Sequence, residues 1–268
     1  MSGTARSGCG WTRGVGKGLT LGVALFFGGC ATSKEPPLVA PRAIVAPYDT
    51  SRGEVLWAVV PLRNESGTSL VDVGAMSDKV VAAVEQVQGV RCLPLNRTLQ
   101  AMNVLGYTTL RNPGEARTLA QAMGVDGVLV GSVTSYDPYV PTLGLSLALY
   151  AKPGSMAQGR QPLDPRSLTL RSTETPVGTW SREEGPVAVV SEHLDAKNHQ
   201  VLMDVRAYAE GREKAPSALG WRRYTASMDL FSEFGAYHIV DELMKKEWIR
   251  LPGSPTGVGP GRSAAAEE

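Results

Sequence analysis

Cysteine and histidine are the residue types in this sequence that could do chemistry, and both are scarce: Cys9, Cys30 and Cys92, with three histidines. A thiolate can act as a nucleophile or bind a metal. Cys92 lies in a strand-like run, where two interpretations stand side by side: a catalytic nucleophile, or a small buried apolar residue, which is the more common role.

The histidines are His193, His199 and His238, and they are not arranged as metal ligands. The sequence has no His-Glu-x-x-His or paired Cys-x-x-Cys pattern, so neither a catalytic nor a structural metal site is predicted. It also lacks the Gly-x-Ser-x-Gly elbow of many hydrolases. We therefore expect a protein without catalytic residues, metal or cofactor. An envelope hydrolase without a recognisable motif is the alternative.

Residues 1–29 have the composition of an export signal. Arg6, Arg13 and Lys17 supply positive charge without any acid, and an apolar run follows from Leu19 to Phe27. This run is about half of the ~20 residues that span a bilayer, which favours a cleaved signal peptide over a membrane helix. An uncleaved hydrophobic anchor is the alternative.

The run Phe27-Gly28-Gly29-Cys30 resembles the bacterial lipobox, although members of that group usually have Leu where Phe27 stands. The resemblance implies diacylglyceryl transfer to the Cys30 thiol, cleavage before Cys30 and acylation of the new amino group. Two or more acyl chains anchor a protein stably, whereas one holds it only reversibly. In enteric-type members of that group, an Asp directly after the lipidated cysteine retains the protein at the inner membrane. Ala31 at this position therefore favours the outer membrane. Cys92 is then the one free thiol, and no disulfide framework can be built.

Removal of residues 1–29 leaves 24 Lys and Arg against 26 Asp and Glu, a net charge near −2. A general nucleic-acid binder needs a basic face to neutralise phosphates. The charge balance therefore excludes nucleic acid as the expected partner.

Proline and glycine mark the predicted domain boundaries. Residues 30–53 are proline-rich and are expected to form a lipidated tether. Residues 54–251 carry the folded domain, within which 152–186 form a loop-rich insertion. Residues 252–268 have the composition of a disordered tail.

Hydrophobic periodicity predicts an α/β fold, a central mixed sheet with flanking helices, because strands and helices alternate along the first half. Residues 201–208 either pair as a strand or begin a helix. The expected strands are 55–62, 90–95, 125–133, 143–150 and 186–194, and the expected helices are 70–87, 96–105 (with Asn96 as its cap), 112–124 and 224–251.

Two segments resemble a group of envelope proteins: the curli-export lipoprotein CsgG, the penicillin-binding-protein activator LpoB and the N-terminal domain of TolB. The segments are Trp57-Ala-Val-Val-Pro-Leu-Arg-Asn-Glu-Ser-Gly67 and Ala120-Gln-Ala-Met-Gly-Val-Asp-Gly-Val-Leu-Val-Gly-Ser-Val133. The resemblance covers roughly residues 55–150. It implies the fold and an envelope location, and it supplies no catalytic residues. Asn64 as a turn cap and Gly131 as a close-packing position are the simplest roles, ahead of direct binding.

The expected function is that of an outer-membrane lipoprotein on the periplasmic face, which binds an envelope protein partner without catalysis. A homo-oligomer is compatible with the resemblance. Aromatic and arginine residues are common interface anchors, which makes Trp221-Arg222-Arg223-Tyr224 a candidate partner-binding segment. Packing of the two aromatic rings before the last helix is the commoner explanation of that segment.

The alternative within the same group is an oligomeric secretion pore of the curli-export type. Leu143 to Tyr150 alternates as a membrane strand would, but its would-be partner, residues 167–174, has only two apolar positions before charges intervene. One such strand is insufficient, so the pore is the second choice.

Overall fold

The computed structural model describes residues 40–152, 156, 185–212 and 218–251. The predicted signal peptide (1–29), Cys30, nearly all of the insertion (152–186) and the tail (252–268) lie outside these residues. Their assignments remain predictions.

Six strands of the described residues form one mixed sheet, which confirms the predicted α/β class. The strands β5, β2, β3 and the first part of β6 run parallel, and β6, β7 and β8 form an antiparallel meander. The order across the sheet is β5 (Val90–Leu93), β2 (Val55–Val59), β6 (Gly127–Asp137), β7 (Thr142–Ala151) and β8 (Ala188–Asp195), with β3 (Arg63–Asn64) also paired to β6.

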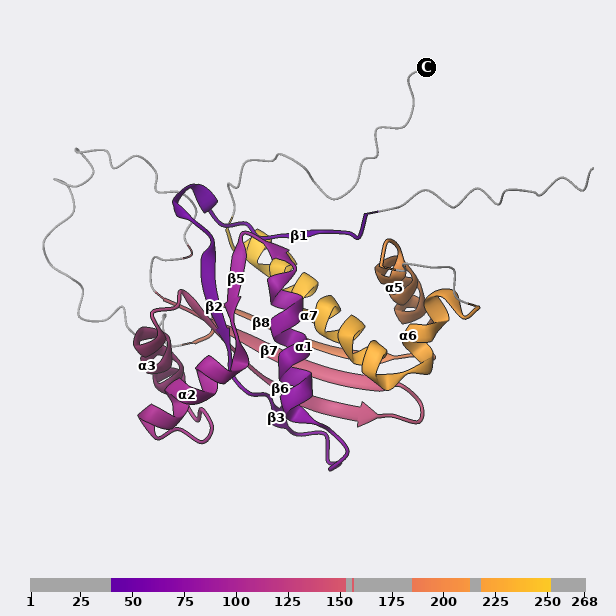
Figure 1. The fold of residues 1–268 in the computed structure, drawn as a ribbon, viewed down its shortest axis with the longest axis horizontal. Helices are drawn as coiled ribbons and strands as arrows, with labels where there is room; N and C mark the ends of the chain where they lie inside the picture. The colour runs from indigo at the N-terminus through magenta and orange to yellow at the C-terminus, as the bar shows by residue number, and fades with distance from the viewer. Residues whose placement is uncertain (1–39, 153–155, 157–184, 213–217, 252–268) are drawn as a thin grey trace, which may run out of the picture. The chain divides into compact units, whose positions relative to one another are not determined.

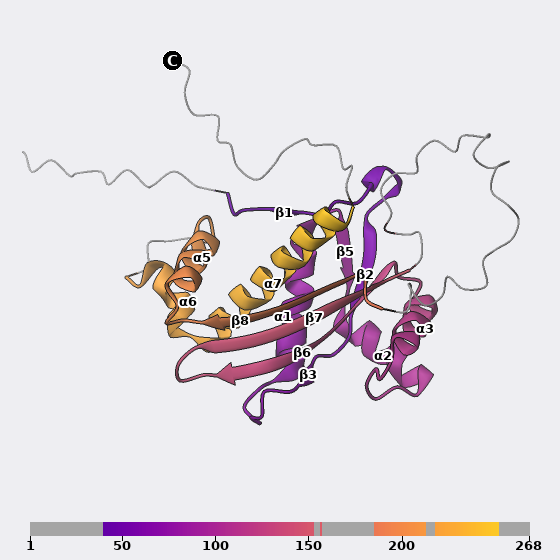
Figure 2. The ribbon, with the colours of Figure 1, turned by 180° about the vertical axis from the view of Figure 1, so that it is seen from behind.

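Helices cover the two faces of this sheet unequally. On one face, α1 (Val73–Glu85) and α7 (Met228–Arg250) pack on a large core that includes Trp57 (Figure 1). On the other face, α2 (Leu95–Leu105) and α3 (Pro113–Met123) cover β2, the start of β6 and the adjoining end of β7, as the reverse view shows (Figure 2). Because β2 is buried on both faces, its sequence is a continuous apolar run.

The alternating leucines of β7 all face the core. Leu143, Leu145, Leu147 and Leu149 are buried in the cluster that α7 covers, and alternate residues of the neighbouring β8 are exposed. The pattern that made β7 a candidate membrane strand is therefore the pattern of a sheet covered on one face. Within the part of the chain that the structure describes, no helix has both the length and the apolar character needed to cross a membrane.

The helix α3 begins and ends as predicted. The Asn112 side chain accepts the N–H of Glu115, Pro113 occupies the first turn, and Gly124 ends the helix at a positive φ of 68°. The expected cap of α2 is wrong. Asn96 lies inside the first turn, and Pro94 precedes the helix without any side-chain cap.

The C-terminal half settles the open choice for residues 201–208, which form the helix α5 (His199–Ala209). The predicted single helix 224–251 is two helices. A short one, α6 (Arg223–Ala226), follows the 3-10 helix η3 (Gly220–Arg222), and Ser227 takes an extended conformation before α7 begins.

The predicted tether boundary at residue 53 needs correction. Residues 44–45 form β1 (Ile44–Val45), which pairs in parallel with β4 (Val87–Gln88), and η1 (Thr50–Arg52) follows. Ile44, Ala46 and Tyr48 are buried in the main core. The prolines at 41 and 47 stand on either side of this pairing rather than within it, so they do not prevent it.

Candidate functional site

The predicted partner-binding segment is mostly a packing element. Tyr224 is buried, with its ring edge-on to that of Tyr208 at 5.3 Å, and Trp221 packs against the same core. Arg222 is exposed and lies over the Trp221 ring at 5.1 Å. The structure thus places Tyr224 in the core, as the packing interpretation predicts.

Cys92 is a buried core residue. Burial, together with the nearby Glu85 carboxylate, raises the pKa of its thiol to about 12. A nucleophilic cysteine needs the thiolate near neutral pH, and this environment disfavours it. The interpretation of Cys92 as a small apolar residue is confirmed.

Asn64 and Gly131 have the structural roles that were expected of them. The Asn64 side-chain oxygen accepts from the N–H and the hydroxyl of Ser66, and its amide donates to the Thr68 carbonyl. A Cβ on Gly131 would lie 2.5 Å from the Ser146 carbonyl oxygen and from a Leu147 methyl. One residue shapes the turn after β3, and the other lets β6 and β7 approach.

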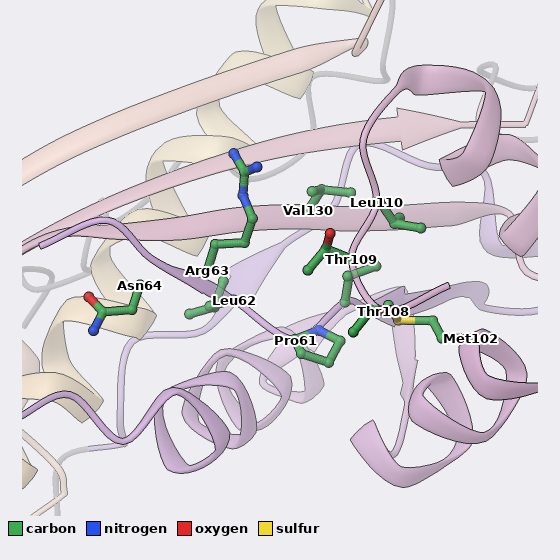
Figure 3. A pocket seen from close by; sticks show the side chains of 10 residues that line it. Pro61, Leu62, Arg63, Asn64, Met102, Thr108, Thr109, Leu110 and Val130 are labelled. Carbon is green, nitrogen blue, oxygen red and sulfur yellow. The ribbon is translucent and has the colours of Figure 1, made fainter. Parts of the chain in front are cut away.

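A cavity of about 350 Å³ opens at the carboxyl end of β2 (Figure 3). β5 and β6 lie on either side of β2. The chain reaches β5 through α1 on one face of the sheet, and then reaches β6 through α2 and α3 on the other face. The end of β2 is therefore a topological switch point, where ligands of α/β sheets commonly bind. The lining side chains are mainly apolar and come from the β2–β3 connection, β3, α2, the α2–α3 connection and β6. They are Val60, Pro61, Leu62, Arg63, Asn64, Met102, Thr108, Thr109, Leu110 and Val130.

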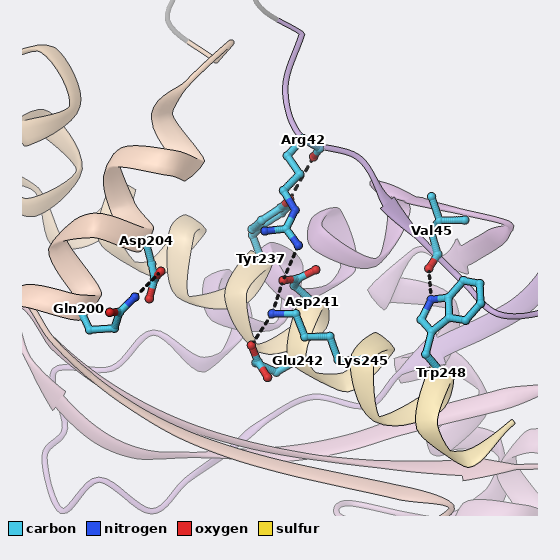
Figure 4. A network of polar contacts seen from close by, with 9 residues as sticks. All are labelled: Arg42, Val45, Gln200, Asp204, Tyr237, Asp241, Glu242, Lys245 and Trp248. Carbon is cyan, nitrogen blue, oxygen red and sulfur yellow. Dashed lines mark hydrogen bonds and ion pairs between the residues drawn. The ribbon is translucent and has the colours of Figure 1, made fainter. Parts of the chain in front are cut away.

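The segment 42–48, which we call the strap, is fastened to α7 by polar contacts along its length (Figure 4). Tyr237 donates to the Arg42 carbonyl at 3.0 Å, and the Trp248 indole donates to the Val45 carbonyl at 2.9 Å. The Arg42 guanidinium pairs with Asp241 at 3.7 Å. The strap is therefore held by side chains and not only by its pairing with β4.

At Tyr48, the last residue of the strap, a buried carboxylate holds the segment in place. Glu247 is fully buried; it accepts the Tyr48 hydroxyl at 3.0 Å and two Arg250 hydrogen bonds at 2.7 and 2.6 Å. Burial and the Glu247 charge both raise the pKa of the Tyr48 phenol above its ordinary value. A buried charge needs such partners, because leaving it unpaired costs several kcal/mol.

A second cavity, of about 290 Å³, lies between α5, α7 and the start of the strap. It brings together both signs of charge, and its lysine and arginine side chains are paired with carboxylates. Lys245 contacts Asp241 at 2.9 Å and Glu242 at 2.6 Å, and Gln200 donates to Asp204. Among the described residues, no cluster of histidine, cysteine or carboxylate side chains could hold a metal ion.

The sequence pattern of residues 42–48 did not lead us to expect the strap. Its proline-rich composition was assigned to the tether, although Ile44, Ala46 and Tyr48 alternate as the inward residues of a strand do. The partners on α7 lie about 200 residues away, so only the folded chain brings them together. The alternation was the one signal available.

Comparison with known proteins gives distant structural matches. No family model matches the chain, and no curated protein sequence matches it. The lipoprotein GNA1162 of Neisseria meningitidis is 18% identical, with a TM-score of 0.36 over 54% of this chain and 85% of that one. The hypothetical protein CT253 of Chlamydia trachomatis is 8% identical, with a TM-score of 0.37 over 73% and 98%.

The C-terminal domain of LpoB from Salmonella enterica is also among the matches, at 17% identity and a TM-score of 0.31 over 42% of this chain and 77% of that one. LpoB is one of the proteins that the Trp57–Gly67 and Ala120–Val133 segments resemble, so a structural match to that group is found. At these identities and TM-scores the matches assign no function to this chain.

Proposed function

We propose that the chain is an exported lipoprotein, anchored through Cys30 in the outer membrane on its periplasmic face, whose α/β domain binds an envelope protein without catalysis. The observation that carries the proposal is the run Phe27-Gly28-Gly29-Cys30 directly after the apolar segment that begins at Leu19. Diacylglyceryl transfer would form a thioether at Cys30, and cleavage of the Gly29–Cys30 bond would free an amino group for a further acyl chain.

The strap gives the anchor a fixed point of attachment. Because the chain enters the core at Ile44, the proposed tether from Cys30 would end at residue 43. Fourteen extended residues span at most ~50 Å. A mechanical force applied through the tether would act first on the strap. α7 holds the strap through hydrogen bonds of Tyr237, Trp248 and Glu247.

Binding is favoured over catalysis by the state of the polar groups in the two cavities. The cavity at the end of β2 is lined mainly by apolar side chains. In the second cavity the Lys245 ammonium already contacts two carboxylates, Asp241 and Glu242. An active site instead needs charged groups that are available to a substrate, whereas this ammonium is engaged within the domain.

Intact mass and membrane fractionation test the anchor, with the full chain and its Cys30→Ala variant expressed in a bacterial host. The expected wild-type product starts at Cys30, carries acyl mass and sediments with the membranes, whereas the variant carries no acyl mass. Identical, full-length and unacylated products from both genes would disprove the anchor.

Amine-reactive crosslinking in intact cells tests the partner. The described surface offers reactive lysines on several sides, including Lys152, Lys197 and Lys246. We expect a discrete adduct that contains the full chain and a different protein. Adducts of the chain with copies of itself alone, or none at all, would contradict a heteromeric partner.

A further inference from the structure

The turn between β6 and β7 presents one highly exposed aromatic side chain, that of Tyr139. The sequence of the turn is Asp137-Pro-Tyr-Val-Pro141, where hairpin turns ordinarily carry glycine, asparagine or aspartate. Tyr139 has 88% of its surface exposed, more than any other large apolar side chain among the described residues. Pro138, Val140 and Pro141 beside it are half-buried, so the Tyr139 ring is the apolar surface that the turn offers to another molecule.

The turn holds Tyr139 in one position. Asp137 accepts the backbone N–H groups of Tyr139 at 2.8 Å and Val140 at 3.2 Å, and Thr142 donates to the Val140 carbonyl at 2.9 Å. Pro138 and Pro141 each have a fixed φ. A side chain presented by a rigid backbone loses little entropy on binding, which makes it a good interface anchor.

Two carboxylates lie at this turn. Asp137 closes it, and Asp195 lies opposite Thr142 in the pairing of β7 with β8. Burial raises the pKa of the nearby Tyr136 phenol, and the charges of Asp229 and Asp72 raise it further, although Asp229 is itself paired with Lys79. Such a surface complements a partner with lysine or arginine around an apolar pocket.

The turn also lies at the opposite end of the domain from the strap. The strap pairs beside the start of β2 and β5, where Ala46 donates to the Gln88 carbonyl and Val55 to the Gly89 carbonyl. β6 pairs in parallel with β2 over its first three residues and continues over its full length of eleven residues, ~35 Å, to the turn. Figure 1 shows the β6–β7 hairpin at the right-hand end of those two strands and β1 across the top of the view, near β5 and the end of α7.

We infer that Tyr139 is the anchor of the partner interface. The partner is a protein with an apolar pocket that takes the phenol ring, rimmed by basic side chains that face the carboxylates around the turn. This inference rests on the proposed function and specifies the surface that the domain uses. The acidic surroundings argue against an anionic lipid surface as the occupant.

Site-specific photocrosslinking tests the inference in the full chain, expressed in its source bacterium. Tyr139 is replaced by the photoreactive residue p-benzoylphenylalanine. Matched controls carry the same residue at Val104 on α2 and at Ile249 on α7, which are 82% and 80% exposed. We expect a single heteromeric protein adduct from position 139 and none from the two controls.

Several outcomes would overturn the inference. They are an equal adduct from all three positions, an adduct with a second copy of the chain, an adduct with lipid or cell-wall glycan, and no adduct. If amine-reactive crosslinking still yields a heteromeric complex while position 139 stays silent, the inference fails and the proposed function stands. If both experiments are silent, the proposed partner fails as well.

Affinity measurements with the protein identified by the adduct give the second test. Tyr139→Ala should weaken binding by about 30-fold, the range of a central aromatic anchor, and Tyr139→Phe by no more than about threefold. Asp137→Ala keeps the ring but frees the turn, so about a fivefold loss is expected. Equal affinity of Tyr139→Ala and wild type would contradict the inference.

Discussion

The two ends of the domain handle polar and aromatic side chains in opposite ways. At the strap end, Tyr48, Glu247 and Trp248 are satisfied by contacts within the domain. At the hairpin end, Tyr139 extends into solvent and only the backbone of the turn is held. The first end uses its side chains for stability, and the second leaves one available to another molecule.

This difference separates residues that hold the fold from residues that are free to bind. An aromatic side chain inside a hydrogen-bonded network loses its function when the network breaks, together with the fold. An exposed one can be removed without that loss. Substitutions at the two ends should therefore move stability and binding independently.

The largest effect on stability is expected from Glu247→Ala. The substitution leaves the Tyr48 hydroxyl buried without its acceptor and Arg250 without its carboxylate, at a cost of about 3 kcal/mol. Urea unfolding followed by circular dichroism measures it. Glu242→Ala, which removes a partly exposed ion pair on the same helix, should cost less than about 1 kcal/mol. Equal losses would show that the buried contacts of Glu247 contribute no more to stability than the partly exposed ion pair of Glu242.

Tyr224 and Tyr139 provide a matched pair of tyrosines for the same comparison. Tyr224→Ala should destabilise the domain by about 3 kcal/mol, because its ring is buried against Tyr208. Tyr139→Ala should change stability by less than about 0.5 kcal/mol. A stable Tyr224→Ala protein that loses its partner would instead restore the 221–224 segment as the binding surface.

Alkaline pH should weaken the strap end of the core. Cys92 stays protonated in the fold up to about pH 12, whereas the unfolded chain releases that proton near 9. Because the native state holds more protons in this window, the free energy of unfolding falls as pH rises, by about 1 kcal/mol between pH 8 and 10. Urea titrations at both pH values measure this, and Cys92→Ala should show a smaller fall. A fall of the same size in the variant would assign the effect to other groups.

A loss of similar size is expected at the hydrogen bond between Trp248 and the strap. Trp248→Phe keeps an aromatic ring but loses the hydrogen bond to the Val45 carbonyl, so we expect a loss of about 1 kcal/mol. Ile249→Ala, at the neighbouring exposed position, is the control and should lie within about 0.5 kcal/mol of wild type. Thermal unfolding of both variants would show whether Trp248 fastens the strap or only covers it.

Local sequence determined the elements that local physics controls. The cap and stop of α3 at Asn112 and Gly124 follow from short-range hydrogen bonds, and the leucine alternation of β7 follows from the two-residue repeat of a strand. The continuous apolar run of β2 predicted burial on both faces. The proposed anchor at Cys30 is likewise a matter of adjacent residues and needs no fold to be stated.

Only the tertiary structure decided the roles of residues whose partners are distant in sequence. Tyr48 and Glu247 lie 199 positions apart, and the burial of each depends on the other. The same holds for Trp221, Tyr224 and Tyr139, because an aromatic residue serves a core or a surface equally well until packing settles which side faces water. Composition assigned the strap to a tether for the same reason: the strand that it pairs with, and the helix that holds it, come together only in the fold.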